Sequence, residues 1–308
     1  LRTPLPPEES FSDDPLRMLR AARFIAGYHL VPDDALVAAV KAMAPRLSIV
    51  SMERVRDEFD KLLVVDDPSA GLWFIAQTGL AEQFLPELPA LAVEQDPIHR
   101  HKDVLAHTIA VVANTKPDLV LRMSALLHDI GKPATRQFSG KGVSFHHHEV
   151  VGARMARKRL TELRWPTDEL TDVVKLVELH LRFHTYSMGW TDSAIRRYVR
   201  DAGPLLDQLN ALTRADCTTR NEAKAKRLSE RMDKLEREIE RLRTQEELDS
   251  IRPDLDGVQI MAHLGLKPSR DVGEAVAFLL ELRLEHGPLG EEEALRRLDE
   301  WWAERNGA

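Results

Sequence analysis

Two histidines and two aspartates in three separate segments are the side chains of this sequence best suited to chemistry. His128 and Asp129 end the apolar run of ALLHDIGKPAT, His107 lies upstream in DVLAHT, and Asp216 lies downstream in TRADC. Two imidazoles and two carboxylates suit a divalent metal of intermediate softness, such as Mn, Fe, Co, Ni or Zn, and suit Mg less well. Side chains that point inward from several helices of a bundle form such sites. The four residues therefore predict a metal site held between helices.

A second set combines one carboxylate with three guanidinium groups at regular spacing. Asp14, Arg17, Arg20 and Arg23 recur at every third position of FSDDPLRMLRAARF. We expect a helix over residues 14–28, in which each three-residue step rotates by about 60°, so that the four side chains form a slanting ribbon. One interpretation is a helix N-terminus with a favourable aspartate and an exposed ion pair, worth roughly a few tenths of a kcal/mol.

The alternative interpretation of this ribbon is recognition of a nucleotide base. A carboxylate accepts a hydrogen bond from the exocyclic amino group of cytosine or adenine, and an arginine donates to a ring nitrogen or a carbonyl. Uracil and guanine present a carbonyl oxygen at that position, which would face the carboxylate of Asp14. A pair such as Asp14 and Arg17 can therefore select C and A over U and G, while the remaining arginines hold a triphosphate.

The same segment resembles the nucleotide-selecting helix of the bacterial CCA-adding enzymes (tRNA nucleotidyltransferases), a class shared with bacterial poly(A) polymerases. SMERVRDEFDKLL, which starts at Ser51, resembles the next helix of that family. The resemblance implies that Asp14 and Arg17 are the amino-acid template for CTP and ATP and that Arg20 and Arg23 bind nucleotide as well. It also implies that the second helix mainly braces the first, through Glu53, Arg54, Glu58 and Lys61.

The family carries its catalytic carboxylates in an N-terminal head, after a Gly-Ser, and they bind the two metal ions (Mg²⁺) of the transfer step. This sequence has no Gly-Ser pair, and its one Asp-x-Asp, Asp254-Leu255-Asp256, follows a proline near the end. We interpret those two aspartates as turn and cap residues. The resemblance therefore leads us to expect the neck, body and tail of such an enzyme without its head, and no transfer by this chain alone.

The His/Asp set resembles that of the HD-domain metal-dependent phosphohydrolases, segments of which occur inside many CCA-adding enzymes. The resemblance implies that the domain binds Mn, Ni, Co, Fe or Mg, attacks a phosphate ester and uses Lys132 to contact the phosphate. The alternative that the site is vestigial or purely structural stays open. The matching positions, with two further ligands for a second metal, are His107, His128, Asp129, Asp216, His148 and His180.

Composition favours an all-α fold. The chain has 308 residues, 30% charged and 6% aromatic, with only 15 glycines, which is typical of long charged helices. We expect an elongated arrangement of a nucleotide-selecting neck (1–90), an HD metal-binding body (91–220) and a long helix with a tail that binds tRNA (221–308). Helices are also expected from Asp33 or Asp34 and from Ser51, and a loop or small hairpin at residues 136–145.

A local excess of positive charge offers a surface for RNA. The chain carries 43 Lys and Arg against 50 Asp and Glu, a net charge of −7, whereas the region around the start of the expected long helix is basic. Contacts with tRNA phosphates are one interpretation and an ordinary solvated face is the other. The residues in question are Arg220, Lys224 and Arg227, with Lys267 and Arg270 at a turn of the tail.

These observations lead to one function with two alternatives. We expect part of an enzyme that adds C and A to the tRNA 3′ end from CTP and ATP, with an additional HD phosphohydrolase site. A free-standing HD phosphohydrolase (a cyclic phosphodiesterase or phosphatase) and a poly(A) polymerase are the alternatives. A single cysteine and the lack of an apolar stretch of about 18 residues favour a cytoplasmic protein outside the membrane.

Overall fold

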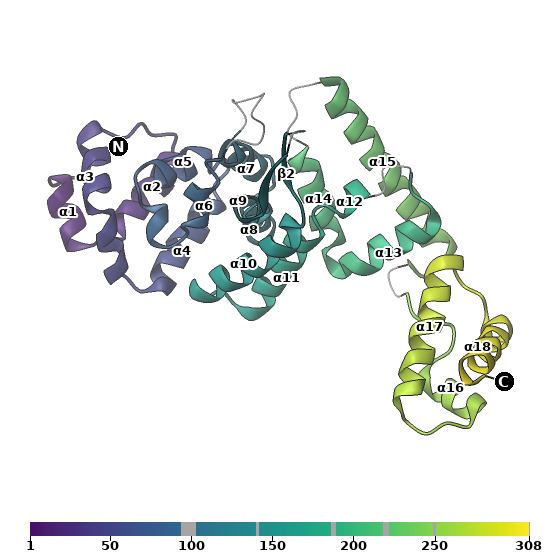
Figure 1. Cartoon of the computed structure of the whole chain (residues 1–308). Helices are drawn as coiled ribbons and strands as arrows, with labels where there is room; N and C mark the ends of the chain where they lie inside the picture. Colours follow the sequence, from purple (N-terminus) through teal and green to yellow (C-terminus); the bar gives the residue numbers. More distant parts are fainter. Residues whose placement is uncertain (94–102, 140–141, 186–188, 218–221, 249–250, 308) are drawn as a thin grey trace. The chain divides into compact units, whose positions relative to one another are not determined.

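Helices form nearly all of the regular structure, which confirms the all-α prediction (Figure 1). The structure is a computed structural model, and it describes residues 1–93, 103–139, 142–185, 189–217, 222–248 and 251–307. Within these ranges the one sheet is an antiparallel hairpin of β1 (Arg136–Ser139) and β2 (Gly142–Phe145), with Arg136 opposite Phe145. The chain divides into two compact units, Leu1–Phe183 with Asp207–Lys226, and His184–Leu206 with Arg227–Ala308.

The first unit begins with small helices that pack around α2 (Arg17–Gly27) and continues with longer ones. Its other elements are α1 (Pro7–Asp13), α3 (Asp34–Met43), η1 (Ala44–Ile49), α4 (Met52–Leu63), α5 (Ser69–Gln77), η2 (Ala81–Gln83), α6 (Glu87–Ala90), α7 (Val104–Ala113), α8 (Leu119–Leu127), α9 (Lys132–Thr135), α10 (His148–Glu162), α11 (Thr167–Leu179) and α14 (Leu206–Asp216). The short helix α12 (Arg182–Thr185) follows α11.

The second unit contains α13 (Asp192–Ala202), η3 (Gly203–Leu205) and most of α15 (Glu222–Gln245). It ends with α16 (Gly257–Leu264), α17 (Arg270–His286) and α18 (Glu291–Asn306), which enclose a small core around Ile260, Leu279 and Leu298. Along α15 apolar residues recur at alternating steps of four and three residues, as in coiled coils; Met232, Leu235, Ile239 and Leu242 of this series are buried, whereas Leu228 is only partly buried. No helix among the described residues combines the length and the apolar character needed to cross a membrane.

Several helices start at an aspartate that caps them, but the helix that carries the three arginines does not. Asp33, Asp103 and Asp118 cap α3, α7 and α8 by accepting a backbone N–H two or three residues ahead. The helix expected from Asp14, by contrast, begins at Arg17, and a separate helix, α1, precedes it. Asp14 has an extended backbone (φ −145°, ψ 100°) because the residue before a proline is pushed away from the helical region.

Arg122, in the middle of the apolar helix α8, joins the two groups of helices within the first unit. Its side chain is buried, and its guanidinium donates to the backbone oxygens of Leu63, Asp66 (2.9 Å) and Thr115 (3.1 Å), and also to that of Val65. These hydrogen bonds connect the turn after α4 to α8, the helix that His128 follows.

We expect Arg122→Met to lower the free energy of unfolding by about 3 kcal/mol or more, because it leaves several buried carbonyl groups without donors. Urea unfolding of the two proteins measures this difference. The exposed neighbour Lys116 serves as the control, since Lys116→Met removes a positive charge from solvent. If Arg122→Met lowers the free energy of unfolding by less than about 1 kcal/mol, the hydrogen bonds of Arg122 are not needed for stability.

Asp60 of α4 carries a partly buried carboxyl group whose protonation depends on folding. Burial raises the pKa of Asp60 to about 7, although Arg56, with its Nε 3.9 Å away, opposes the shift. Between about pH 4 and pH 7 the folded protein therefore binds a proton that the unfolded chain releases, so this group makes the protein less stable as pH rises.

We expect Asp60→Asn to raise the free energy of unfolding more at pH 8 than at pH 5, by up to about 3 kcal/mol, because the amide needs no proton. Denaturant unfolding at the two pH values tests this result. An equal effect of the substitution at pH 5 and pH 8 would refute the raised pKa.

Candidate metal centre and nucleotide site

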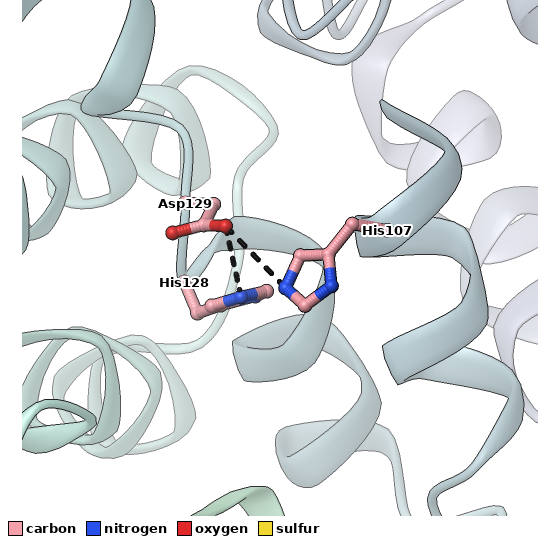
Figure 2. Close-up of side chains that lie close together, drawn as sticks. All are labelled: His107, His128 and Asp129. Atoms are coloured by element: carbon pink, nitrogen blue, oxygen red, sulfur yellow. Dashed lines mark ion pairs between the residues drawn. The ribbon is translucent and has the colours of Figure 1, made fainter. Parts of the chain in front are cut away.

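Six side chains from five elements of the first unit meet at one place. His107 comes from α7, His128 and Asp129 follow the last residue of α8, His148 begins α10, His180 follows the last residue of α11, and Asp216 ends α14. Figure 2 shows how His107, His128 and Asp129 point toward one another. The structure thus brings together all six residues that the sequence predicts as metal ligands.

Asp129 lies at the middle of the cluster and divides it into two groups. Its Oδ2 lies 3.2 Å from Nε2 of His128 and 3.6 Å from Nε2 of His107. Its Oδ1 lies 3.3 Å from Nε2 of His148, and His180 completes this second group. Asp216 joins the first group, with its Oδ1 2.9 Å from Nε2 of His107. One carboxylate therefore offers a separate oxygen to each of two neighbouring sets of ligands.

The backbone fixes which ring nitrogen of three histidines faces the centre. Nδ1 of His128, His148 and His180 lies 2.7, 2.8 and 2.6 Å from the carbonyl oxygen three residues earlier. A carbonyl accepts, so each Nδ1 carries the proton and donates it. Each Nε2 is turned into the cluster, buried and without a hydrogen-bond partner in the described structure. Metal-ligating histidines are typically held in this way by a bond from the other ring nitrogen.

Charge within the cluster shifts the pKa of its groups in opposite directions. Burial lowers the pKa of His128, but Asp129 and Asp216 outweigh this effect and raise it to about 10. Burial, together with the positive charge of His128, lowers the pKa of His180 to about 3. Burial acts against ionisation of the two carboxyls, yet the positive charge of His128 and the neighbouring histidines outweigh it and hold the pKa of Asp129 and Asp216 well below the usual range. The cluster thus keeps two carboxylates charged in a buried place.

These residues fit a divalent metal. The donor set consists of imidazole nitrogens and carboxylate oxygens, which suits Mn, Fe, Co, Ni or Zn. Three buried Nε2 atoms without partners are the strongest single indication, because a buried polar atom without a bond is costly unless a ligand satisfies it. A cation at the centre would also neutralise the buried carboxylate of Asp129 and the partly buried one of Asp216.

Two further residues beside the cluster shape it. Lys132 donates to Oδ2 of Asp129 at 2.7 Å, so the residue predicted to contact a phosphate lies next to the central ligand. Gly131 lets α10 approach closely, since a Cβ at this position would lie 2.2 Å from the carbonyl oxygen of His148. Gly131 therefore allows α10 to pack closely against the cluster, and Lys132 places a positive charge beside Asp129.

The four residues of the expected nucleotide ribbon lie near one another but are held differently from the prediction. Asp14 precedes α2, and its Oδ2 lies 3.4 Å from Arg54 of α4 and 3.9 Å from Arg20. Arg17 does not pair with Asp14 and instead donates to the backbone oxygen of Ser10 at 3.0 Å. The side chain of Asp14 is 24% exposed and that of Arg17 is 41% exposed, so both are accessible to a ligand.

Glu58 holds the other two arginines. Its carboxylate is buried, with Oε2 3.4 Å from Nε of Arg20 and Oε1 2.5 Å from Nε of Arg23. The Arg23 guanidinium also lies over the ring of Phe24 at 4.7 Å from its centre. A buried carboxylate that bridges two arginines fixes their positions on α2, as expected if the second helix braces the first.

The predicted RNA contacts are only partly described. Arg220 and the side chain of Lys224 lie outside the described residues. Arg227, Lys267 and Arg270 are exposed in the second unit, and Arg270 donates to Glu274 at 2.9 Å. Nothing in their contacts assigns them to RNA, so their role stays a prediction.

The sequence did not indicate the role of Arg122, and it predicted that Arg54 braces the first helix without identifying Asp14 as its partner. A charged residue inside the apolar run LVLRMSALL was the available signal for Arg122. No local signal exists for the contact between Arg54 and Asp14, since it joins residues forty positions apart.

Comparison with family models matches two parts of the chain. The model described as a probable RNA- and SrmB-binding site of polymerase A matches residues 31–91, and the HD domain model matches residues 104–243. The first match lies beside the Asp14 and Arg17 region, and the second contains all six residues of the His/Asp cluster.

Two curated proteins match almost the whole chain. The A-adding tRNA nucleotidyltransferase of Deinococcus radiodurans is 32% identical over 310 residues, which cover 96% of this chain and 70% of that protein. The CC-adding tRNA nucleotidyltransferase of Thermus thermophilus is 33% identical over 313 residues, which cover 96% of this chain and 68% of that protein.

Solved structures share the fold at lower identity. The CCA-adding enzyme of Bacillus stearothermophilus in complex with CTP aligns with a TM-score of 0.66 and 17% identity, covering 99% of this chain and 66% of that one. Another CCA-adding enzyme with CTP aligns with a TM-score of 0.54 and 13% identity, covering 94% and 60%. The chain thus spans about two thirds of the length of these relatives and structures.

Proposed function

The chain belongs to the CCA tRNA nucleotidyltransferase family, and from this membership and the geometry of the neck we propose that it selects CTP and ATP for an enzyme that extends the tRNA 3′ end. The single observation that carries the proposal is the accessible carboxylate of Asp14 beside the arginines of α2. Asp14 accepts from the amino group of cytosine or adenine, and Arg17 donates to the adjacent ring nitrogen or carbonyl. We assign no residue of this chain to the chemical step of transfer.

The neighbours of these two residues support the proposal. Oδ1 of Asp14 accepts the backbone N–H of Leu16 at 3.2 Å, and a guanidinium nitrogen of Arg54 lies 3.4 Å from Oδ2, so the side chain is held in place. Ser10 holds Arg17 through its backbone oxygen and its hydroxyl. Arg20 and Arg23, fixed by Glu58, supply positive charge for a triphosphate. Pre-positioned donors and acceptors of this kind select a base without a nucleic-acid template.

The complete natural protein tests this function when it is incubated with tRNA that lacks its 3′ nucleotides and with one nucleoside triphosphate at a time. We expect incorporation of C, of A, or of both in order, because relatives named for A addition and for CC addition match the chain equally well. Incorporation of U or G at comparable rates would overturn the assignment of the selector. A long run of A on unrelated RNA would indicate a poly(A) polymerase instead.

A second function is favoured by the buried Nε2 atoms of the cluster. We infer that His107, His128, Asp129 and Asp216 hold one divalent metal and that His148 and His180, with Asp129, hold another. A bound metal supplies Lewis-acid activation of water and of a phosphate ester. Lys132, 16% exposed beside Asp129, then places a positive charge where the phosphate would lie.

Metal analysis of the purified chain and assays with 2′,3′-cyclic nucleotides and phosphate monoesters test this second function. Turnover that requires an added divalent metal, with no turnover for His128→Ala, is the expected result. Bound metal without hydrolysis of either ester class would assign the centre a structural role.

A further inference from the structure

The solvent-facing side of α10 carries basic side chains that neither proposed site uses. Arg154, Arg157 and Lys158 lie on this helix, and Arg164 follows two residues after its end. All four are exposed. Positions three and four apart lie on the same side of a helix, so the first three form one group. We call these four residues the α10 basic row.

The basic row has no counter-charge in the part of the chain that the structure describes. Arg159, on the same helix, forms a bidentate ion pair with Glu87, with a shortest distance of 2.8 Å. It also forms a single ion pair with Glu162, at 2.7 Å. None of the four residues of the row forms such a pair among the described residues. The exposed Asp168 at the start of α11 does not pair with any of them either. Glu162, near the end of α10, thus pairs with Arg159, and the positive charges of the basic row are not neutralised by an ion pair.

This pattern is unfavourable for the helix by itself. Like charges three or four residues apart destabilise a helix by about 0.2–0.5 kcal/mol for each pair. Helix α18 shows the usual arrangement, in which Glu293 pairs with Arg296 and Arg297, three and four residues further along. A chain with a net charge of −7 could supply such acids readily. An anionic partner would relieve the repulsion that α10 retains.

The length and the polarity of the row indicate a polyanion. At 1.5 Å per residue, Arg154 is about 12 Å from the end of α10 at Glu162, and Arg164 lies beyond that end, so the row is longer than one phosphate group. The apolar side of α10, with Ala153, Ala156 and Leu160, is buried, and α10 packs against α11. A helix that binds a membrane surface exposes its apolar side to lipid, so this helix does not fit a bilayer.

We propose that the α10 basic row binds the phosphate backbone of RNA, and that within the proposed function this RNA is tRNA. The row lies on the helix whose first residue is His148, so the RNA would pass along the same element that contributes a ligand to the metal centre. The contacts are with phosphates, so they position the RNA without reading its sequence.

The test compares tRNA binding by the full chain and by Arg154→Gln/Lys158→Gln across salt concentrations from about 50 to 200 mM. Each lost phosphate contact reduces the slope of log K against log salt by about 0.7–0.9. We expect the double variant to bind about tenfold more weakly near 0.1 M salt and to lose about 1.5 from that slope. The control is Lys116→Gln/Arg252→Gln, which removes one exposed lysine and one exposed arginine elsewhere and should bind as the wild type does.

Three results would overturn the inference. If the wild-type chain binds tRNA and the double variant keeps the same affinity and slope, the row does not bind RNA, although tRNA remains the partner. If the wild-type chain shows no binding to tRNA, this inference and the assignment of tRNA fail together. If Arg154→Gln/Lys158→Gln loses binding to vesicles of anionic phospholipid while tRNA binding is unchanged, the row serves a membrane.

Discussion

Replacing Asp129 by alanine should remove all bound divalent metal from the chain, whereas replacing His180 should remove only part of it. Asp129 is the residue common to both groups of ligands, with one carboxylate oxygen turned to each. His180 belongs to the second group alone. We therefore expect up to two metal ions in the wild type, none in Asp129→Ala and one in His180→Ala, as measured by elemental analysis after loading with Mn, Co or Ni.

Two controls make this result specific. His147 precedes His148 directly and is 84% exposed, so His147→Ala should leave the metal content unchanged. Asp129→Asn keeps the shape of the side chain while removing its charge, and it replaces the alanine variant if that protein does not fold. A full metal content in both Asp129 variants would contradict the assignment of this residue as the shared ligand.

The same centre should bind metal more tightly as pH rises. Without metal His128 is protonated up to about pH 10, because the neighbouring carboxylates outweigh burial. A metal ion must displace this proton from Nε2, so affinity should rise about tenfold for each pH unit between pH 6 and pH 9. His180, with a pKa near 3, is already neutral there and adds nothing to the slope. Metal titrations in this range measure the slope, and affinity independent of pH would refute the protonated state of His128.

Replacing Asp14 by asparagine should let the natural enzyme accept UTP and GTP. Asparagine can turn its amide N–H toward the carbonyl oxygen that uracil and guanine present, which the carboxylate repels. The ratio of U to C incorporated should therefore rise by about 10- to 100-fold, the equivalent of one well-formed base contact. Steady-state incorporation into tRNA with each nucleotide measures this ratio.

The matched control for this substitution is Glu9→Gln, which neutralises an exposed carboxylate on the preceding helix. It should leave the ratio unchanged. Arg54→Ala should produce an intermediate change, because it frees the carboxylate of Asp14 from the guanidinium at 3.4 Å. Unaltered selectivity in Asp14→Asn would remove Asp14 from the selector, whatever else the neck binds.

The metal centre could be predicted from the sequence because its ligands carry their own signals. His128 and Asp129 end an apolar run, and Gly131 follows where only a residue without a Cβ fits against α10. What the sequence did not provide was the role of each oxygen of Asp129. That role depends on how α8, α10 and α11 pack, which no local pattern specifies.

The neck shows the opposite case, in which periodicity alone misplaced a residue. The three-residue rhythm put Asp14 on the same helix as the arginines, whereas Pro15 forces it into an extended backbone before α2. The sequence predicted that Arg54 braces this helix, but not that Arg54 and Arg20 contact Asp14. The α10 basic row was also missed, because a run of basic residues in the sequence does not show which of them find an acidic partner.

Whether this neck selects C and A is tested most directly by incubating the complete natural protein with tRNA and an equimolar mixture of the four nucleoside triphosphates. The tRNA 3′ ends that it makes are then sequenced. We expect ends extended with C and A only for the wild type, and ends that contain U or G for Asp14→Asn. Ends with U or G from the wild type would contradict this selection.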